Sequence, residues 1–442
     1  MDIKRPILVV ICTLFFSLTL FTGVLLQSQQ LNPEIAELGR DFSYILNVID
    51  QNYVEKVDRK ELFLKAANEI ASRDQYSGFL LERSITQIEE SIDGNYVGIG
   101  IEINRKSDHL VVTDIHPFSA ASGKLKFDDR IYFLDKQAVE ELDNTKLYEL
   151  LRGPVGSTIT LGLKRGEDET LIEIPLTRKM TIKKPIRFVQ MLDEKNKIGY
   201  MYIDIFNNNL AQSFSLEYLQ LLKSSGGMKA FILDLRGNPG GGIESAVAFC
   251  DLFLKAGVIV ATIGNEEGIR GKEVLYMAKE GNELPLVPIL IMLDRESASA
   301  AELSSSCLRD HKIAKIFGEK SYGKGETQTT IPMTSKVIGD YGLKLTTSKF
   351  YSKSGFEANP KVSISGIGIT PDFSFDFGFQ DTMLTRYKNF RRAWGLWNQE
   401  LAEGKPLEEV KSKNFYFMDL EKYDPGLKKA VEILSSEEGF KW

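Results

Sequence analysis

The stretch from Leu286 to Leu293 is almost continuously apolar, and it constrains the fold more than any other segment. Such a strand is buried on both faces, which is typical of a parallel sheet covered by helices. From Ile198 onward, apolar strands alternate with helical segments, so we expect an α/β core with a mixed sheet. The expected strands are Ile198–Ile205, Ala230–Leu235, Val258–Ile263 and Leu286–Leu293 in the parallel layer, then Thr327–Ile331 and Leu343–Tyr351; the expected helices lie near Glu244–Leu254 and Ala301–Asp310.

Two regions precede this core. From residue 32 to about residue 90, apolar residues at three- and four-residue spacing predict helices whose stripes face a core. The stripes are Phe42, Ile45, Leu46 and Ile49, then Leu62, Ala66 and Ile70. Short strands with one helix near Thr145–Leu151 then predict a small β-rich module. We place the boundaries at residues 1–30, 31–90, 91–180, 181–376 and 377–442, the last part being a charged helical tail.

The amino terminus indicates the compartment. Lys4 and Arg5 precede an uncharged, mostly apolar stretch, Ile7–Leu26, which as a helix would span about 30 Å, the thickness of a hydrocarbon core. We expect an uncleaved single-pass anchor in a bacterial inner membrane, and a cleaved signal is the alternative. The positive charges stay in the cytoplasm. Either reading therefore places the rest of the chain in the periplasm or otherwise outside the cytoplasm.

Composition excludes several classes of protein. The chain has 442 residues, 43% hydrophobic and 26% charged, which excludes a disordered chain and a multi-span membrane protein. The formal charge of -6 argues against nucleic acid as a partner. Only three cysteines and three histidines occur, which excludes a multi-cysteine zinc cluster, and we expect no metal and no other cofactor. For Cys250 and Cys307, a disulfide and two buried thiols both stay open.

A turn of small residues, Asp294–Glu302, follows the most apolar strand and starts a helix. Ligands of parallel sheets bind beyond the carboxyl ends of the strands, and a serine there lies at the positive end of the helix dipole. Nearby backbone N–H groups, such as that of Ala300, lack intrahelical partners and can stabilise an oxyanion. The alternative is that Ser297 or Ser299 merely caps the helix.

A glycine-rich turn, Arg236–Gly242, follows the strand Phe231–Leu235 in the same way. Glycines let a substrate carbonyl approach the backbone closely. The alternatives are a phosphate cradle and a plain tight turn. The sequence of a phosphate-binding loop is missing here, so this turn is a weak signal for nucleotide binding.

Lys324 lies between two glycines and is the third element of the pattern. A lysine acts as a general base only when it is neutral, and burial in an apolar site lowers its pKa. The neutral amine can take the proton of a serine hydroxyl. In a strand, Gln328 would share the face of Lys324 and orient its amine. Taken alone, this segment is a weak signal, and a solvated turn is the interpretation it favours.

Together and in this order, the three elements resemble the carboxy-terminal processing peptidases, also called tail-specific proteases, which are serine endopeptidases with a Ser–Lys dyad. The likeness runs from about residue 35 to residue 376. It rests on Leu233–Gly241, Ser297–Glu302 and Gly323–Gln328, with weaker matches at Leu345–Thr347, Gly368–Asp372, Asp74–Ser77 and Gly98–Gly100.

The resemblance implies a role for each matching residue. Ser299 matches the nucleophile, Lys324 the general base and Gln328 the residue that positions the lysine, while the N–H groups of Gly241 and Ala300 match the oxyanion hole. The module at 91–180 matches a PDZ domain, which would add the substrate tail as a strand and capture its carboxylate by backbone N–H groups. The implied substrate-binding residues are Tyr96, Val97, Gly98, Ile99, Gly100 and Ile101.

The implied function is an anchored serine endopeptidase that cleaves extracytoplasmic proteins with accessible C-terminal tails through an acyl-enzyme. An adaptor protein and a homo-oligomer are both left open. A catalytically silent, membrane-tethered scaffold for protein C-termini is the alternative, and a Ser–His hydrolase using His311 is a third reading. Glu326 raises a question, because in strict strand alternation it would face Lys324 and keep that lysine charged, unless a bulge at Gly325 turns it away.

Overall fold

The computed structural model describes residues 32–378, apart from residues 117, 225 and 267, and residues 424–436. The predicted anchor, Ile7–Leu26, and most of the predicted tail lie outside these residues. Among the helices of the described ranges, none combines the length and the apolar character that crossing a membrane requires.

The core is a six-stranded sheet in the order β10–β11–β12–β15–β16–β19. All neighbouring pairs from β11 to β19 are parallel, and only β10 is antiparallel to its neighbour. The strands are β10 (Ile186–Asp193), β11 (Ile198–Ile203), β12 (Ala230–Asp234), β15 (Ile289–Leu293), β16 (Ala314–Gly318) and β19 (Phe373–Ser374). Every residue of β11, β12 and β15 is buried, so the predicted α/β layer with a mixed sheet is confirmed.

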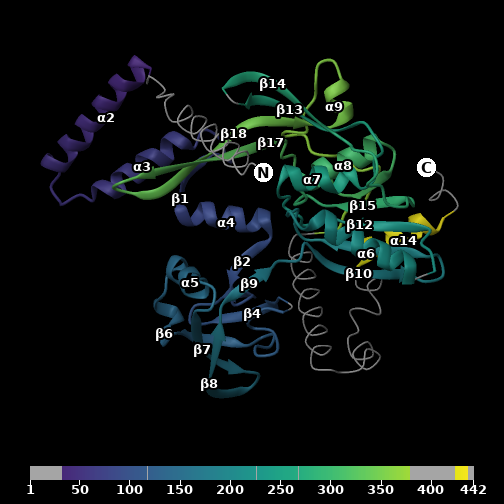
Figure 1. Ribbon diagram of the computed structural model, residues 1–442, viewed down its shortest axis with the longest axis horizontal. Helices are drawn as coiled ribbons and strands as arrows, with labels where there is room; N and C mark the ends of the chain where they lie inside the picture. The colour runs from purple at the N-terminus through teal and green to yellow at the C-terminus, as the bar shows by residue number, and fades with distance from the viewer. Residues whose placement is uncertain (1–31, 117, 225, 267, 379–423, 437–442) are drawn as a thin grey trace, which may run out of the picture. The chain divides into compact units, whose positions relative to one another are not determined.

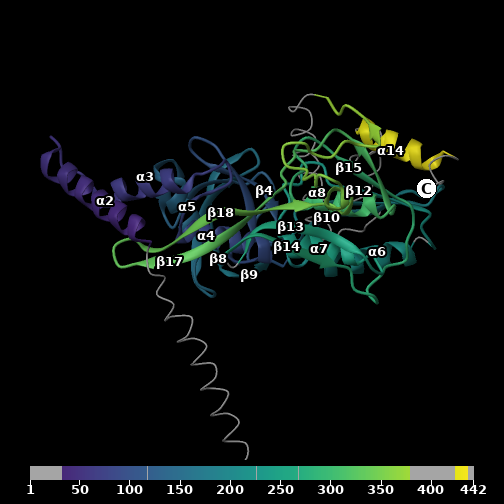
Figure 2. The same cartoon turned by 90° about the horizontal axis from the view of Figure 1, so that it is seen from above.

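Helices cover both faces of this sheet. One face packs against α6 (Leu210–Ser224), α7 (Ile243–Asp251) and α8 (Ala300–Asp310). The other face packs against α14 (Pro425–Ser435), which lies on the opposite side of the sheet from α6 and α7 (Figure 2). The four apolar residues of α14 that enter the core recur at three- and four-residue spacing, as an amphipathic helix requires; they are Leu427, Ala430, Val431 and Leu434.

A second sheet is antiparallel. In it β13 (Val258–Glu266) pairs with β14 (Ile269–Met277) and β18 (Gly339–Tyr351), and β17 (Glu326–Ser335) pairs with β18. A short helix, α9 (Lys353–Glu357), follows β18. The prediction that Val258–Ile263 joins the parallel layer is therefore wrong. Its apolar run is followed by a tight connection to β14, and two strands so connected pair locally as a hairpin.

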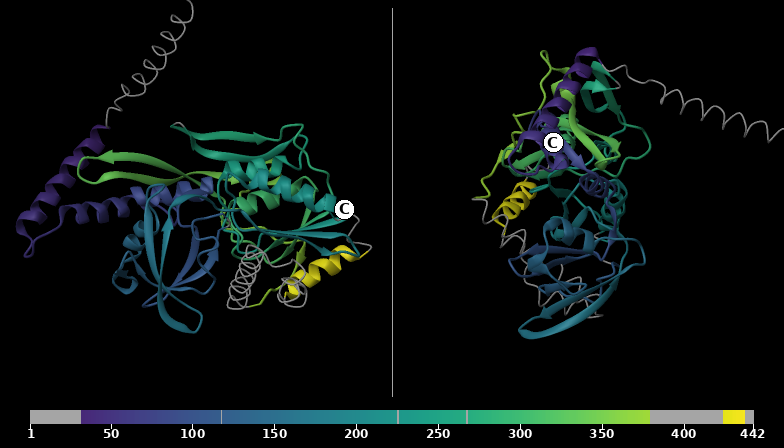
Figure 3. Two further views of the ribbon diagram at one scale, coloured as in Figure 1. Left: turned by 60° about the horizontal axis from the view of Figure 1, so that its bottom comes forward. Right: turned by 90° about the vertical axis from the view of Figure 1, so that its left-hand side faces the viewer.

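The predicted β-rich module is built around an antiparallel sheet in the order β3–β4–β5–β7–β8, with β6 paired to β5. Its long β7–β8 hairpin is visible in Figures 1 and 3. A separate pair, β2 and β9, connects the module to the chain on both sides. The elements are β2 (Asn95–Gly98), β3 (Ile101–Arg105), β4 (Leu110–Ile115), β5 (Arg130–Leu134), β6 (Gln137–Ala138), α5 (Asn144–Leu151), β7 (Thr158–Arg165), β8 (Asp168–Thr177) and β9 (Lys179–Ile182).

The region before the module is helical, as predicted. It contains α2 (Pro33–Asn52), α3 (Arg59–Ala71), the short strand β1 (Gly78–Leu81) and α4 (Glu82–Asp93). The prediction that the apolar stripes face a core is wrong, because α2 buries none of its residues and α3 buries only Ala71. Periodicity predicts that a helix has an apolar face but does not specify what packs against that face.

Candidate active site

Ser299 directly precedes α8 and is its N-cap residue. The alternative interpretation, that Ser299 caps the helix, therefore agrees with its position. Its backbone angles, however, are φ 56° and ψ -116°, whereas an ordinary N-cap residue is extended. A non-glycine residue in such a conformation is strained, and strained residues that the surroundings enforce cluster at active sites. The conformation therefore points to a role beyond capping.

Ser297, the other serine of the turn, is structural. It is fully buried, and its hydroxyl donates to the carbonyl oxygen of Leu235 at 2.9 Å. Oδ1 of Asp294 accepts the N–H groups of Gly237, Glu296 and Ser297 at 2.9–3.0 Å. Burial raises the pKa of Asp294, and these hydrogen bonds oppose that rise. The buried carboxyl thus fixes the serine turn to the glycine-rich turn after β12.

Gly240 lets the two turns come into contact. A Cβ atom built on Gly240 would lie 2.8 Å from the carbonyl oxygen of Ala298 and 2.9 Å from the nitrogen of Ala300. Ala300 is the first residue of α8, and the first N–H groups of a helix have no intrahelical acceptor. The N–H of Ala300 therefore lies beside the glycine-rich turn, as an oxyanion hole built from both turns requires.

Gly241 is the other predicted oxyanion donor. Phe206 forms a parallel bridge with Gly241, in which the Phe206 N–H donates to Gly240 and the Gly242 N–H donates to Phe206. In such a bridge the central residue's own N–H points away from its partner, so the N–H of Gly241 is directed away from Phe206. A Cβ atom at Gly241 would lie 1.9 Å from the Phe206 oxygen, which explains why glycine stands there.

Lys324 lies in the segment before β17 and is joined to the serine turn through one carboxylate. The N–H groups of Ser299 and Lys324 both donate to Oε2 of Glu302, at 2.8 and 2.9 Å. Burial is the main cause that lowers the pKa of Lys324, and the charge of Lys344 lowers it further. The carboxylates of Glu326 and Glu302 act in the opposite direction without reversing the shift.

Two further predicted neighbours of Lys324 have partners of their own. The Glu326 carboxylate accepts a hydrogen bond from the hydroxyl of Ser365, a residue of a different segment. Its charge still raises the pKa of Lys324, but burial outweighs it. The amide nitrogen of Gln328 donates to Oγ1 of Thr346 on β18 at 3.3 Å. The amide oxygen of Gln328 is the atom that would accept a hydrogen bond from Lys324.

The remaining polar candidates lie elsewhere. His311 caps the far end of α8, where its Nε2 hydrogen-bonds the carbonyl oxygen of Val258, so it is separated from Ser299 by the whole helix. Cys250 and Cys307 are buried free thiols, and their mutual hydrogen bond together with burial raises the pKa of Cys307. Among the described residues, no group of three or more acidic, histidine or cysteine side chains could hold a metal ion.

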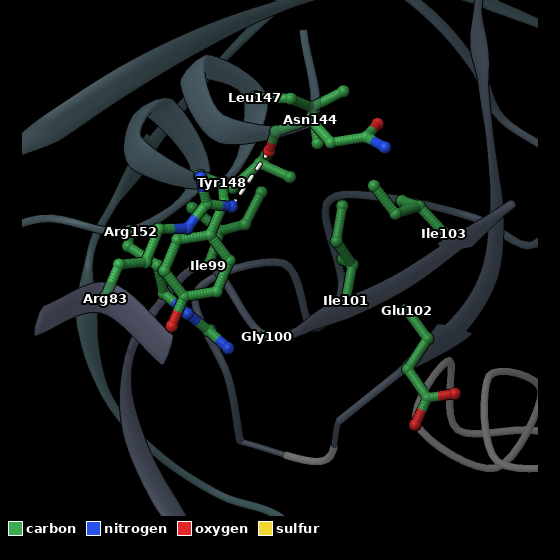
Figure 4. Close-up of a pocket in the computed structure, with 11 residues that line it drawn as sticks. Arg83, Ile99, Gly100, Ile101, Glu102, Ile103, Asn144, Leu147, Tyr148 and Arg152 are labelled. Carbon is green, nitrogen blue, oxygen red and sulfur yellow. Dashed lines mark hydrogen bonds between the residues drawn. The ribbon is translucent and has the colours of Figure 1, made fainter. Parts of the chain in front are cut away.

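The β-rich module contains a cavity of about 330 Å³ between β3 and α5. Figure 4 shows Ile101 and Ile103 of β3 facing Leu147 of α5, with Glu102 pointing away. In the module's sheet β3 is an edge strand, paired with β4 on one side. The unpaired backbone of an edge strand can accept an added strand, so this cavity has the form of a peptide groove.

Three of the six predicted substrate-binding residues, Ile99, Gly100 and Ile101, line this groove. Tyr96, Val97 and Gly98 do not, because they form β2 and pair with β9. The helical side of the groove was not predicted as a binding surface. The sequence predicted a helix near Thr145–Leu151 but not the strand that it faces. The missed lining residues are Arg83, Asn144, Leu147, Tyr148, Leu151 and Arg152, together with Glu102 and Ile103 of β3.

Comparison with known proteins agrees with this arrangement. Peptidase family S41 matches residues 197–375 and the PDZ domain family matches residues 97–176. A carboxy-terminal-processing protease of Bartonella bacilliformis is 30% identical over 376 residues, which cover 83% of this chain and 82% of that protein. A probable CtpA-like serine protease of Staphylococcus haemolyticus is 26% identical over 82% of this chain and 70% of that protein.

Among solved structures, the photosystem II D1 C-terminal processing protease covers 76% of this chain and 92% of its own, with 22% identity and a TM-score of 0.42. The match to the Bartonella relative extends over most of both proteins, across the PDZ module and the α/β core. The catalytically silent scaffold is therefore set aside in favour of a serine peptidase. The chain belongs to the carboxy-terminal processing peptidases of family S41 and carries a PDZ domain.

Proposed function

We propose that the chain cleaves proteins outside the cytoplasm with a Ser299–Lys324 dyad and selects them by their C-terminal tails. The observation that carries the catalytic part is the shared oxygen of Glu302, which accepts the N–H groups of both residues. A second support is the lowered pKa of Lys324, whose main cause is burial. A lowered pKa increases the fraction of neutral amine near neutral pH, which a general base needs.

In this mechanism the hydroxyl oxygen of Ser299 attacks the scissile carbonyl while its proton passes to the Lys324 amine. The oxyanion that forms accepts hydrogen bonds from the N–H groups of Gly241 and Ala300. The tetrahedral intermediate collapses as Lys324 returns the proton to the leaving amine, which leaves an acyl-enzyme. Lys324 then takes a proton from water, the hydroxide attacks the ester, and Ser299 recovers its proton. Gln328 orients the lysine amine through its amide oxygen.

Tail recognition uses the groove between β3 and α5. An incoming C-terminal segment would pair with β3 as an added strand, and its last side chain would enter the apolar cavity lined by Ile101 and Leu147. The backbone N–H groups around Ile99–Ile101 would donate hydrogen bonds to the terminal carboxylate. Gly100 has a φ of 79° there, a conformation that turns the chain sharply before β3 and suits a carboxylate-binding loop.

The location is proposed from the sequence. Lys4 and Arg5 followed by the apolar stretch Ile7–Leu26 support a single-pass anchor with the peptidase in the periplasm or otherwise outside the cytoplasm. A cleaved signal would give the same side of the membrane. Sequencing the amino terminus of the protein from isolated membranes distinguishes the two, because an anchor keeps residues 1–26.

The dyad is tested with Ser299→Ala and Lys324→Ala, assayed by release of fluorescent peptides from labelled casein. We expect both variants to lose cleavage, because alanine provides neither the nucleophilic hydroxyl of Ser299 nor the basic amine of Lys324. The far-UV circular dichroism spectrum should stay unchanged. Lys320→Ala, which changes a lysine outside the dyad, is the matched control and should keep its activity. Turnover by Ser299→Ala would eliminate the dyad.

A further inference from the structure

Glu302 makes more hydrogen bonds than a helix cap needs. Its Oε2 accepts the N–H groups of Ser299 and Lys324, and its Oε1 accepts the N–H of Gly323 at 2.7 Å and the hydroxyl of Ser321 at 2.5 Å. The side chain is fully buried. One of these four donors belongs to the serine turn, and the other three belong to the segment that carries Lys324.

Three of the four partners are backbone N–H groups, which can only donate, and this favours the ionised carboxylate. A carboxylate has only acceptor sites, whereas a protonated carboxyl would place a hydrogen against one of the donors. Burial raises the pKa of Glu302 above its usual value, and the hydrogen bonds from Ser321, Gly323, Ser299 and Lys324 oppose this rise without cancelling it. A buried carboxylate with a full set of donors is held rigidly, because losing any one contact leaves a charge or a backbone N–H without a partner.

The position of Glu302 connects two segments that are distant in sequence. Residue 302 lies in the first turn of α8, and residues 321–324 precede β17. The backbone nitrogens of Ser299 and Lys324 lie within 2.8 and 2.9 Å of a single atom, so they are less than two hydrogen-bond lengths apart. If the Glu302 carboxylate only capped α8, it would need the hydrogen bond from the Ser299 N–H and no other.

We propose that Glu302 is a positioning residue, whose carboxylate sets the placement of Ser299 relative to Lys324 and acts on the lysine as a fixed countercharge. The proposal rests on the Ser–Lys dyad proposed above. Burial and three charged side chains act on the charge state of Lys324: burial and Lys344 favour the neutral amine, while Glu326 and Glu302 favour the ammonium. Removing Glu302 therefore changes both the geometry and the protonation of the dyad.

The test is the rate at which a fluorescent fluorophosphonate labels the full-length protein between pH 5 and pH 10. In Glu302→Gln one amide oxygen replaces two acceptor oxygens, and the amide NH₂ group meets N–H donors, so part of the connection is lost. We expect the labelling rate on the high-pH plateau to fall on the order of 100-fold, as for a reacting group displaced by about 1 Å. The midpoint of the pH profile should move to lower pH, because the carboxylate no longer favours the ammonium.

Asp294→Asn is the matched control. Asp294 is also a buried carboxyl of the serine turn that accepts backbone N–H groups, but it does not contact the segment of Lys324. Loss of the Asp294 carboxylate should slow labelling and leave the midpoint of the pH profile at its wild-type value. If Glu302 has a purely structural role, Glu302→Gln should show this same pattern. An unchanged midpoint of the pH profile in Glu302→Gln would therefore overturn the countercharge role. A wild-type labelling rate would overturn the positioning role.

Two further variants keep the outcomes separable. If Glu302→Gln does not fold, Ser321→Ala removes one donor and keeps the charge; we expect slower labelling with an unchanged midpoint, and a wild-type rate would count against the proposal. Ser299→Ala tests the dyad itself. Labelling of Ser299→Ala would remove the proposed function together with this inference, whereas an unlabelled Ser299→Ala beside a wild-type-like Glu302→Gln would remove the inference alone.

Discussion

A Cβ atom on Gly240 would lie 2.7 Å from the Cβ of Ser299. Real Cβ atoms do not approach so closely, so the proposed nucleophile occupies its place only because its neighbour has no side chain. Gly240 also has a φ of 98°, a conformation that other residues rarely adopt. The glycine-rich turn and the serine turn therefore constrain each other directly, without an intervening side chain.

Gly240→Ala should abolish most of the cleavage. The new methyl group forces the serine turn away from the glycine-rich turn, and a displacement of about 1 Å at a reacting group costs on the order of 100-fold in rate. Gly237→Ala is the control. Gly237 also has a positive φ, 68°, but the nearest atom to an added Cβ is an oxygen of the Glu296 carboxylate at 3.9 Å. Casein cleavage by both variants measures the difference. Equal activities would show that the contact with Ser299 has no catalytic consequence.

Lys344→Gln should move the pH profile in the direction opposite to Glu302→Gln. Burial first and the charge of Lys344 second lower the pKa of Lys324. Without Lys344 the pKa of Lys324 rises, so the neutral base appears only at higher pH and the acidic limb of kcat/KM shifts upward. Lys349→Gln changes an exposed lysine of the same strand and should leave the limb in place. A downward shift in Lys344→Gln would contradict the sign of this effect.

Most strands and helices of the core were predictable because they depend on local pattern, whereas the three candidate catalytic segments were identified only by their joint resemblance to a peptidase family. The continuous apolar run of β15 and the small residues after it identify a buried strand followed by a turn and a helix, whatever the rest of the chain does. The position of Lys324 between two glycines was a weak signal by itself, and only the resemblance singled this lysine out from the others. Local pattern also predicted α5 but not the strand opposite it.

The sequence did not reveal which distant segments of the chain come into contact. Glu302 ends the serine turn in the sequence, but nothing there indicates that Ser321, Gly323 and Lys324 donate to it. The pairing of β13 with β18 instead of with a strand of the parallel layer is a choice between partners that local hydrophobicity does not distinguish. Contacts between distant segments are therefore the part that needed a structure.

Arg187→Ala should destabilise the protein more than a typical surface substitution does. The guanidinium is 7% exposed and pairs with Glu102, Asp114 and Asp204 at 2.6, 2.6 and 3.0 Å. Removing it leaves three carboxylates together in a poorly hydrated site, which costs about 3–5 kcal/mol when a buried pair is broken. The midpoint of urea unfolding, followed by far-UV circular dichroism, measures the loss.

Arg187→Lys separates charge from geometry at this site. An ammonium is a point charge and cannot span three carboxylates as a planar guanidinium does, so we expect a midpoint between those of the wild type and Arg187→Ala. Because Glu102 belongs to β3, the strand of the peptide groove, the same variants should raise KM for tail-bearing substrates. Unchanged midpoints in both would mean that the cluster contributes nothing to stability.

Asp424→Ala should loosen the C-terminal helix from the core sheet. Asp424 caps α14 by accepting the N–H of Leu427 at 3.0 Å, and it pairs with Arg236 at 2.7 Å. Losing the cap costs about 1 kcal/mol, and a hydrogen bond to a charged group contributes a further ~1.5–3 kcal/mol. Arg236 keeps its second partner, Asp234 at 2.6 Å, so the buried cation is not left alone.

The control for Asp424→Ala is Lys429→Ala on the same helix, whose pair with Glu432 is half exposed on both sides and contributes at most about 1 kcal/mol. We expect the urea midpoint to fall clearly in Asp424→Ala and to change little in Lys429→Ala. Arg236 is the first residue of the glycine-rich turn. Asp424→Ala should therefore also lower kcat, because the turn that presents the Gly241 N–H loses part of its support. Equal midpoints for the two variants would mean that α14 is held by its apolar face alone.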